Sequence, residues 1–153
     1  SLGLVGSEMC IRDRYILKTE QSFDSAHFLG GYEGKCRNIH GHRWRVVIEV
    51  KVDQLETDSQ LRGMHVDFAT LKADLAGETD RLDHAFIMEK GTLKESTVAA
   101  LREEQFHLIE MDFRPTAENF AKYFYEKMQV HGYQVKCATV YETPNNSAAY
   151  CED

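Results

Sequence analysis

The chain lacks a long apolar run, an excess of positive charge and any closely spaced pair of cysteines. No stretch approaches the roughly 20 apolar residues that a membrane-spanning helix needs. Its 18 Lys and Arg residues against 25 Asp and Glu residues give a net charge of −7. This balance argues against a general binder of nucleic acids or anionic membranes, since such proteins present basic surfaces. We therefore expect neither kind of partner, although the charge does not exclude a local basic pocket for a small anion.

Cysteine is sparse, and its spacing predicts no disulfide framework. The four cysteines are Cys10, Cys36, Cys137 and Cys151, with no Cys-x-x-Cys pair among them. Free thiols in a reducing compartment are the better interpretation. The chain also shows no convincing secretory signal, so we expect a cytoplasmic protein. Cys137 and Cys151 are expected to be structurally incidental.

Length and composition indicate one folded domain. The chain has 153 residues, 42% of them hydrophobic and 28% charged, which is typical of a soluble globular protein with a real core. Residues 1–14 have no clear periodicity, and the run 7–14 resembles a translated sequencing-adapter tract. We predict that 1–14 is a non-native or disordered extension and that 15–153 is a single domain.

Hydrophobic periodicity predicts an α+β fold. The clearest signal is the alternation from Trp44 to Val52, which is that of a half-buried strand. Asp67 can cap one helix, and Pro115-Thr116 opens a strongly amphipathic helix that Gly132 ends. The remaining predicted segments are strands at 15–28, 133–142 and 148–151, a weak helical pattern at 92–104 and a possible short strand at 107–111.

The order strand, strand, helix, helix, strand, strand predicts a four-stranded antiparallel sheet with two helices on one face. The edge strands of such a sheet would be exposed in a monomer. Because pairing between subunits would cover them, we expect a homo-oligomer.

Three histidines form the strongest chemical motif. His40 and His42 are two apart at the start of the alternating strand, so they share its apolar face, and His27 ends the preceding strand. Three imidazoles without a fourth protein ligand are typical of a catalytic zinc, which keeps one position open. The alternative is a surface cluster without metal. A structural zinc finger would need a fourth ligand.

Cys36 precedes His40 in a loop with three glycines. Its neighbours Lys35 and Arg37 are cations, which favour a thiolate. Beside a metal site, a thiolate could remove a proton from a bound substrate. The alternative is a small side chain that fills space in a loop.

Two further motifs are weaker. Asp83-His84 could be a proton relay in which the carboxylate orients the imidazole, although adjacent Asp and His are common in loops. Glu142 closes a predicted strand, where it could accept paired N–H groups of an amino-heterocycle or simply be exposed.

Taken together, these segments resemble the 6-pyruvoyl-tetrahydropterin synthase superfamily of tunnelling-fold enzymes. The matching pieces run in family order from 15 to 150: 23–28, Cys36 to His42, 66–68, 82–84, 115–119 and 141–144. The three-residue gap between Cys36 and His40 resembles the bacterial 6-carboxy-tetrahydropterin synthase branch. The pyruvoyl-forming branch typically has a longer gap, and a third branch has Glu in place of Cys36.

The resemblance implies a role for each matching residue. His27, His40 and His42 would hold Zn²⁺, Cys36 would be the general base, and Asp83 with His84 would form a second proton-transfer pair. Glu142 would anchor the pterin ring. Thr116 and Glu118 match a segment that lies near the pterin across a subunit boundary. The assembly implied is a homo-trimer or homo-hexamer with active sites between subunits.

The reaction implied by this resemblance converts 7,8-dihydroneopterin triphosphate to 6-carboxy-5,6,7,8-tetrahydropterin, acetaldehyde and triphosphate, toward queuosine and other 7-deazapurines. The alternatives are the pyruvoyl-forming reaction and a non-catalytic pterin- or zinc-binding protein on the same fold. No glycine-rich phosphate loop is present, so basic side chains or backbone amides must hold the triphosphate. The segment 89–110 has no role that the sequence assigns.

Overall fold

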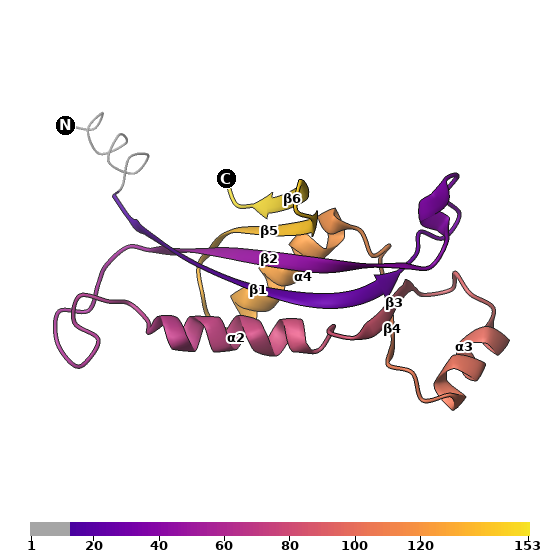
Figure 1. Cartoon of the computed structure of the whole chain (residues 1–153). Helices are drawn as coiled ribbons and strands as arrows, with labels where there is room; N and C mark the ends of the chain where they lie inside the picture. Colours follow the sequence, from indigo (N-terminus) through magenta and orange to yellow (C-terminus); the bar gives the residue numbers. More distant parts are fainter. Residues whose placement is uncertain (1–12) are drawn as a thin grey trace.

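Two long antiparallel strands form the backbone of the fold (Figure 1). The computed structural model describes residues 13–153; residues 1–12, and with them most of the predicted extension 1–14, lie outside the described part. Strand β1 spans Tyr15–His27 and strand β2 spans His40–Val52. They pair along their whole length, from Tyr15 opposite Val52 to His27 opposite His40. The strand predicted at 44–52 therefore begins earlier and includes both motif histidines.

In the described part of the chain, the sheet has six strands, and the prediction of four antiparallel strands is wrong. Strands β3 (Ala85–Glu89), β4 (Leu108–Met111), β5 (Val135–Thr143) and β6 (Asn146–Cys151) complete the order β4-β3-β1-β2-β5-β6. β3 pairs parallel to both β1 and β4, so the sheet is mixed. Five and four residues are too few to display a period, which is why the sequence predicts no strand at β3 and only a possible strand at β4.

Within residues 13–153, three α-helices, not two, accompany the sheet. Helix α2 spans Phe68–Asp80, α3 spans Glu95–Glu103 and α4 spans Ala117–Val130. The side chain of Asp67 caps α2, and α2 and α4 contact the sheet through β1, β2, β5 and β6. Helix α3 lies beside β3 and β4 at one end of the molecule (Figure 1). None of the helices in 13–153 has the length and apolar character needed to cross a bilayer.

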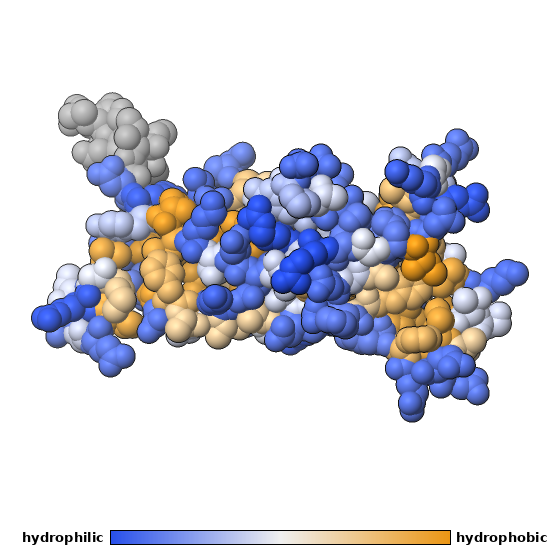
Figure 2. Space-filling model, viewed as in Figure 1, coloured by the Kyte–Doolittle hydropathy of each residue, from blue (hydrophilic) through white to orange (hydrophobic). Residues whose placement is uncertain are grey.

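The core lies between the sheet and helices α2 and α4. Trp44 and Phe23 stack across β1 and β2, and Phe120 of α4 packs edge-on against both rings. A second, smaller core holds Phe28, Met88 and Leu108 under α3. Figure 2 shows polar side chains over the middle of one face and apolar side chains toward its ends. Helices therefore cover the face of β2 that the alternation of its residues predicts to be buried.

Cys137 and Cys151 form a disulfide, so the prediction that both are free thiols is wrong. The two residues are directly opposite each other in the β5–β6 pair, with their Cα atoms 4.1 Å apart. They are 14 residues apart in sequence, and no Cys-x-x-Cys signature marks such a pair. Only the register of the hairpin brings them together.

Candidate functional site

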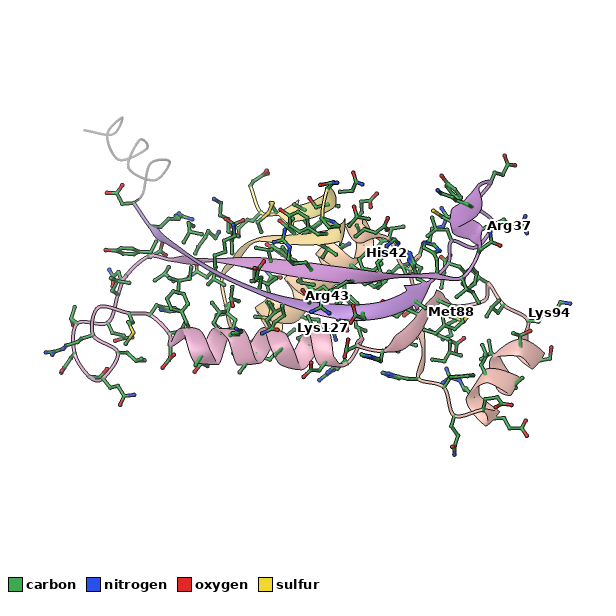
Figure 3. All side chains as sticks on the ribbon, viewed as in Figure 1. Arg37, His42, Arg43, Met88, Lys94 and Lys127 are labelled. Atoms are coloured by element: carbon green, nitrogen blue, oxygen red, sulfur yellow. A yellow bond between two sulfur atoms is a disulfide. The ribbon has the colours of Figure 1, made fainter. Side chains whose placement is uncertain are left out.

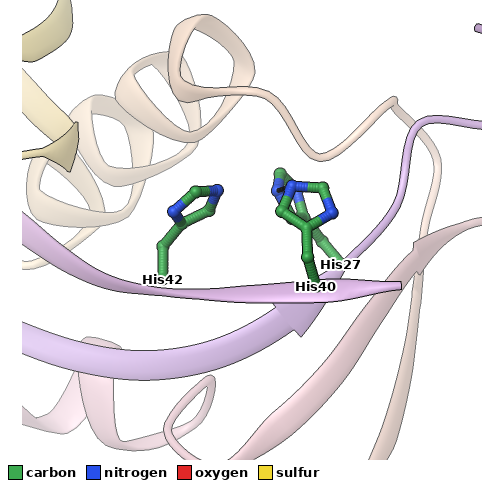
Figure 4. A group of neighbouring side chains, drawn as sticks. All are labelled: His27, His40 and His42. Carbon is green, nitrogen blue, oxygen red and sulfur yellow. Dashed lines mark hydrogen bonds between the residues drawn. The ribbon is translucent and has the colours of Figure 1, made fainter. Parts of the chain in front are cut away.

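The three motif histidines lie on one face of the β1–β2 pair (Figure 4). His27 stands opposite His40, and His42 stands opposite Ser25. One ring nitrogen from each histidine lies within 4.8 Å of the other two. The rings converge as the period-two spacing predicts. Within residues 13–153, no other group of three His, Cys, Asp or Glu side chains is close enough to share an ion.

Backbone carbonyls fix the protonation pattern of two of these rings. The Nδ1 of His27 lies 2.7 Å from the oxygen of Pro115, and the Nδ1 of His40 lies 2.7 Å from the oxygen of Asn38. A carbonyl oxygen can only accept, so each Nδ1 carries the proton and each neutral ring presents a lone pair at Nε2. These two Nε2 atoms face each other at 3.1 Å. Two lone pairs so close are favourable only with a proton or a metal cation to share.

Burial disfavours an added proton between these two Nε2 atoms. The pKa of His27 is lowered to about 4, chiefly by desolvation and also by the neighbouring His40 and His42, against the opposing hydrogen bond to Pro115. Desolvation also lowers the pKa of His42, although Glu142 opposes this shift. Neutral rings are the form that binds metal. The donor set and its hydrogen bonds therefore fit a divalent cation held by three imidazoles.

The site has an aromatic floor with unpartnered polar atoms. Trp44 is fully buried, and its ring centroid lies 5.1 Å from that of His27 and 5.3 Å from that of His42. In the described part of the chain, three buried polar atoms near the cluster lack a hydrogen-bond partner: Ser25 Oγ, His42 Nε2 and Trp44 Nε1. Because orphaned buried polar groups are costly, their grouping favours a polar ligand here.

Glu142 lies beside the histidines, at the end of β5. Its Oε1 is 3.8 Å from the Nε2 of His42. It lines a cavity of about 460 Å³ together with His42, Arg45 and Tyr141, and a second cavity of about 370 Å³ together with Glu118. Both volumes suit a small heterocyclic ligand. A larger cavity of about 610 Å³, lined by residues such as Lys51 and His65, contains none of the predicted site residues.

Cys36 lies in the loop that joins two of the metal-ligand candidates. It belongs to a short 3₁₀ helix, Lys35–Arg37, between the end of β1 and the start of β2. Its thiol is free and half-buried. Its sulfur does not belong to the group of atoms that could share an ion. Within a single chain, Cys36 is therefore not a fourth metal ligand.

Asp83 and His84 form a hydrogen-bonded pair on the loop between α2 and β3. The Nδ1 of His84 donates to Asp83 Oδ2 at 2.8 Å, and the amide of Asp24 donates to Asp83 Oδ1 at 2.9 Å. The latter bond and His84 lower the pKa of Asp83, while Asp83 raises the pKa of His84. A cavity of about 470 Å³ is lined by both His84 and His42. The pair thus shares a cavity with one motif histidine without joining the metal-binding group.

Comparison with known proteins agrees with this geometry. Residues 16–153 match the 6-pyruvoyl tetrahydropterin synthase family. The chain belongs to this family. A Haemophilus influenzae relative named 6-carboxy-5,6,7,8-tetrahydropterin synthase is 32% identical over 89% of this chain and 98% of its own length. An Aquifex aeolicus relative of the same name is 30% identical over 78% and 77%.

Solved structures carry the same fold. The Caenorhabditis elegans 6-pyruvoyl tetrahydropterin synthase superposes with a TM-score of 0.64, covering 92% of this chain and 97% of that one at 22% identity. An uncharacterized Wolinella succinogenes protein superposes with a TM-score of 0.73, covering 92% and 99% at 21% identity. The α+β tunnelling fold of the 6-pyruvoyl tetrahydropterin synthase family is therefore the fold of this chain, with a six-stranded sheet.

In the family segment at 115–119, Thr116 is the N-cap residue of helix α4. The hydroxyl of Thr116 caps helix α4 by accepting from the amide of Asn119 at 3.2 Å. Glu118, in the first turn, lines the cavity that Glu142 also lines. Within one chain, then, the segment already stands beside Glu142, whereas the resemblance implies contact across a subunit boundary.

Sequence reasoning missed the groups that orient the histidines. The acceptors are the main-chain carbonyls of Asn38 and Pro115, and a carbonyl has no residue signature that could have identified them. It also missed Arg43 and Arg45, which line the cavity beside Glu142. Arg45 pairs with Glu20 at 2.8 Å and lies over the ring of Tyr141. Figure 3 labels Arg43 beside His42; as successive strand residues, they point to opposite faces.

Proposed function

We propose that this family member is a zinc-dependent 6-carboxy-5,6,7,8-tetrahydropterin synthase. It would convert 7,8-dihydroneopterin triphosphate to 6-carboxy-5,6,7,8-tetrahydropterin, acetaldehyde and triphosphate in the cytoplasm. The names of relatives such as those from Haemophilus influenzae and Aquifex aeolicus support this activity. The observation that carries the proposal is the convergence of three imidazoles, two of them held with Nε2 free by carbonyl groups.

Zinc is the proposed cofactor. His27, His40 and His42 would hold it, and the group as found in residues 13–153 has no fourth side chain, which leaves a position for substrate. Bound there, zinc would act as a Lewis acid toward the side-chain oxygens of the pterin. Imidazole donors alone also accept other divalent metals, so metal analysis is part of the test.

The remaining residues would bind the substrate and move protons. Cys36 would remove a carbon-bound proton, and the Asp83–His84 pair would return or accept protons during triphosphate loss and carbon–carbon cleavage. The carboxylate of Glu142 would accept from the amino group and ring N–H of the pterin, with Glu118 beside it. Thr116 would contribute chiefly through the position that its cap gives to this turn.

The triphosphate needs cations. Arg43 and Arg45 lie on the face of β2 opposite His42 but line the same cavity as His42 and Glu142, and guanidinium groups suit phosphate oxygens. Both are already paired, Arg43 with Asp24 at 3.0 Å and Arg45 with Glu20 at 2.8 Å. These carboxylates would orient the guanidinium groups while leaving other N–H donors for the ligand.

We further propose a homo-trimer or homo-hexamer with active sites between subunits. Strands β4 and β6 are the two edges of the sheet, and the side chains of β6 are mostly exposed. Unpaired edges of this kind are suited to strand pairing with a second copy. In such an assembly, residues of more than one subunit would line each active site.

A product assay tests the proposed activity. The purified protein, with its metal content measured, is incubated with 7,8-dihydroneopterin triphosphate, and the products are identified by mass spectrometry. We expect 6-carboxytetrahydropterin together with acetaldehyde. A pyruvoyl product without acetaldehyde would instead identify the pyruvoyl-forming branch, against the three-residue gap between Cys36 and His40.

A variant separates catalysis from mere binding. Cys36→Ala should lower turnover by at least about 100-fold, the scale of a lost general base, with zinc content near that of the unmodified chain. His42→Ala should instead lose the metal. A protein that binds pterin and zinc but forms no product with Cys36 intact would support the non-catalytic alternative.

A further inference from the structure

The loop that carries Cys36 is held by hydrogen bonds among its own residues and by contacts from outside. Residues 28–39 connect His27 to His40 and include Gly30, Gly31 and Gly34, while the 3₁₀ helix around Cys36 has no buried residue. Within the loop, the amide of Leu29 donates to the oxygen of Cys36 at 2.9 Å. This bond ties the turn containing Cys36 to the start of the loop, so whatever fixes the start also fixes Cys36.

Arg114 supplies that anchor from outside the loop. Its Nη2 donates to the oxygen of Gly30 at 2.8 Å, across 84 positions of sequence. Its guanidinium also lies 5.7 Å from the ring centroid of Tyr32, within the range of a cation–π contact. A single side chain therefore holds two points of the loop that Cys36 belongs to.

The backbone of Arg114 is itself rigid. Its carbonyl oxygen accepts from the amide of Thr116 at 2.8 Å and from Asn119 Nδ2 at 2.9 Å, which fastens it to the first turn of α4. The next residue, Pro115, accepts from the Nδ1 of His27 at 2.7 Å. Two consecutive residues thus contact two parts of the site: Arg114 holds the Cys36 loop, and Pro115 orients a metal-ligand candidate.

The segment at 89–110, to which the sequence assigns no role, supports the same loop from another side. Phe28 packs into the small core of Met88 and Leu108 under α3. At Gly30, an added Cβ would lie 2.7 Å from Thr92 Cγ2, so the loop is seated directly on a residue that closely follows β3. The hydroxyl of Thr92 donates to the oxygen of Glu89, which fixes its side chain.

We infer that Arg114 is a positioning residue that, with Thr92, sets the place of Cys36 relative to the three histidines. The inference rests on the proposed function only for its catalytic consequence; the anchoring itself is independent of the reaction. Because a misplacement of about 1 Å can cost on the order of 100-fold in rate, loss of this anchor would act on turnover without removing a catalytic group.

The test compares Arg114→Ala with Arg114→Lys and with a matched control, Arg102→Ala. Arg102 donates to Glu110 and to the oxygen of Leu108, so its polar contacts lie between α3 and β4 and not on the loop. For each variant, three quantities are measured: amide hydrogen exchange of residues 29–39, the alkylation rate of Cys36 followed on its own peptide by mass spectrometry, and metal content. Steady-state kcat and KM are added for the pterin substrate.

We expect Arg114→Ala to speed exchange at the Leu29 amide and alkylation at Cys36 by about 10-fold or more, with metal content unchanged. Turnover should fall by about 10- to 100-fold with little change in KM. Arg114→Lys, which keeps a donor, should restore part of each effect, and Arg102→Ala should leave exchange in the loop unchanged.

Unchanged exchange and alkylation in Arg114→Ala would overturn the inference, whatever the activity. Equal effects in Arg102→Ala would also overturn it, because they would indicate general loosening of the α3 end. If the unmodified protein makes no carboxypterin, the proposed function fails, while the exchange and alkylation results still decide the role of Arg114.

Discussion

At the residue scale, the site depends on which nitrogen of each histidine is free. Two rings are bound at Nδ1 by carbonyl oxygens, so the lone pairs at Nε2 are directed before any ligand arrives. Such outer hydrogen bonds orient metal ligands and raise their basicity. In this chain they come from the backbone, which no side-chain substitution at the acceptor can remove. Preorganisation is therefore built into the chain path around Asn38 and Pro115.

The Asp83–His84 pair offers a residue-scale prediction about pH. Asp83 raises the pKa of His84, so the imidazolium persists to a higher pH than an isolated histidine would allow. In Asp83→Asn, the negative charge is gone, and the pKa of His84 should fall toward its ordinary value. The measurement is a titration of the His84 ring protons by NMR.

Asp58→Asn provides the control, since Asp58 lies in an exposed loop. It should leave the titration of His84 where it was. A titration of His84 that is the same in the Asp83→Asn variant as in the unmodified chain would show that the carboxylate does not set the charge of this ring.

At the element scale, helix α4 depends on its cap. Thr116→Ala removes the acceptor for the Asn119 amide and should lower the free energy of unfolding by about 1 kcal/mol. Thr116→Ser keeps a hydroxyl and should lose much less. Urea denaturation compares the three proteins. Equal losses in the two variants would assign the effect to the methyl group of Thr116 instead of its hydroxyl.

The β5–β6 hairpin gives a second prediction at this scale. The disulfide closes the end of the hairpin remote from Glu142 and links residues 14 apart. In oxidising buffer, Cys151→Ser should lower the free energy of unfolding by roughly 2–4 kcal/mol, because the unfolded chain regains the freedom that the crosslink removes.

Added dithiothreitol should abolish most of this difference, since both proteins then lack the crosslink. Cys36→Ser is the control, because Cys36 is free. A difference between Cys151→Ser and the unmodified chain that persists undiminished under reduction would point to lost packing at Cys151.

At the scale of the whole molecule, metal binding and folding should be coupled. Three converging imidazoles exist only in the folded chain, so a bound ion stabilises that state by mass action, by about 4 kcal/mol at roughly 1,000 times its dissociation constant. Chelation should therefore lower Tm, and added Zn²⁺ should restore it. Scanning calorimetry with metal analysis measures both.

His42→Ala should lose this response, while His65→Ala should keep it, since His65 is exposed and lies outside the cluster. A Tm that does not change between chelator and Zn²⁺ in the unmodified protein would argue against a resident ion at these histidines.

Prediction from the sequence succeeded where a period was long enough to read. The alternation of β2 placed His40 and His42 on the buried face, and the helical spacing around Phe120 and Phe124 located α4. The sequence did not predict β3 and predicted β4 and α3 only weakly, because elements this short contain too few residues to display a hydrophobic period. It was wrong about Cys137, because a cross-strand partner is set by register and not by spacing.

The sequence by itself determined the α+β class, the period-two placement of two histidines and the resemblance that led to the family. These features depend on local alternation and on motif order, which the chain carries along its length. Only the tertiary structure decided that the Pro115 carbonyl orients His27, that Arg114 reaches the Cys36 loop, and that two cysteines pair. Each of these contacts joins residues whose proximity results from packing and strand register, and these are properties of the whole fold.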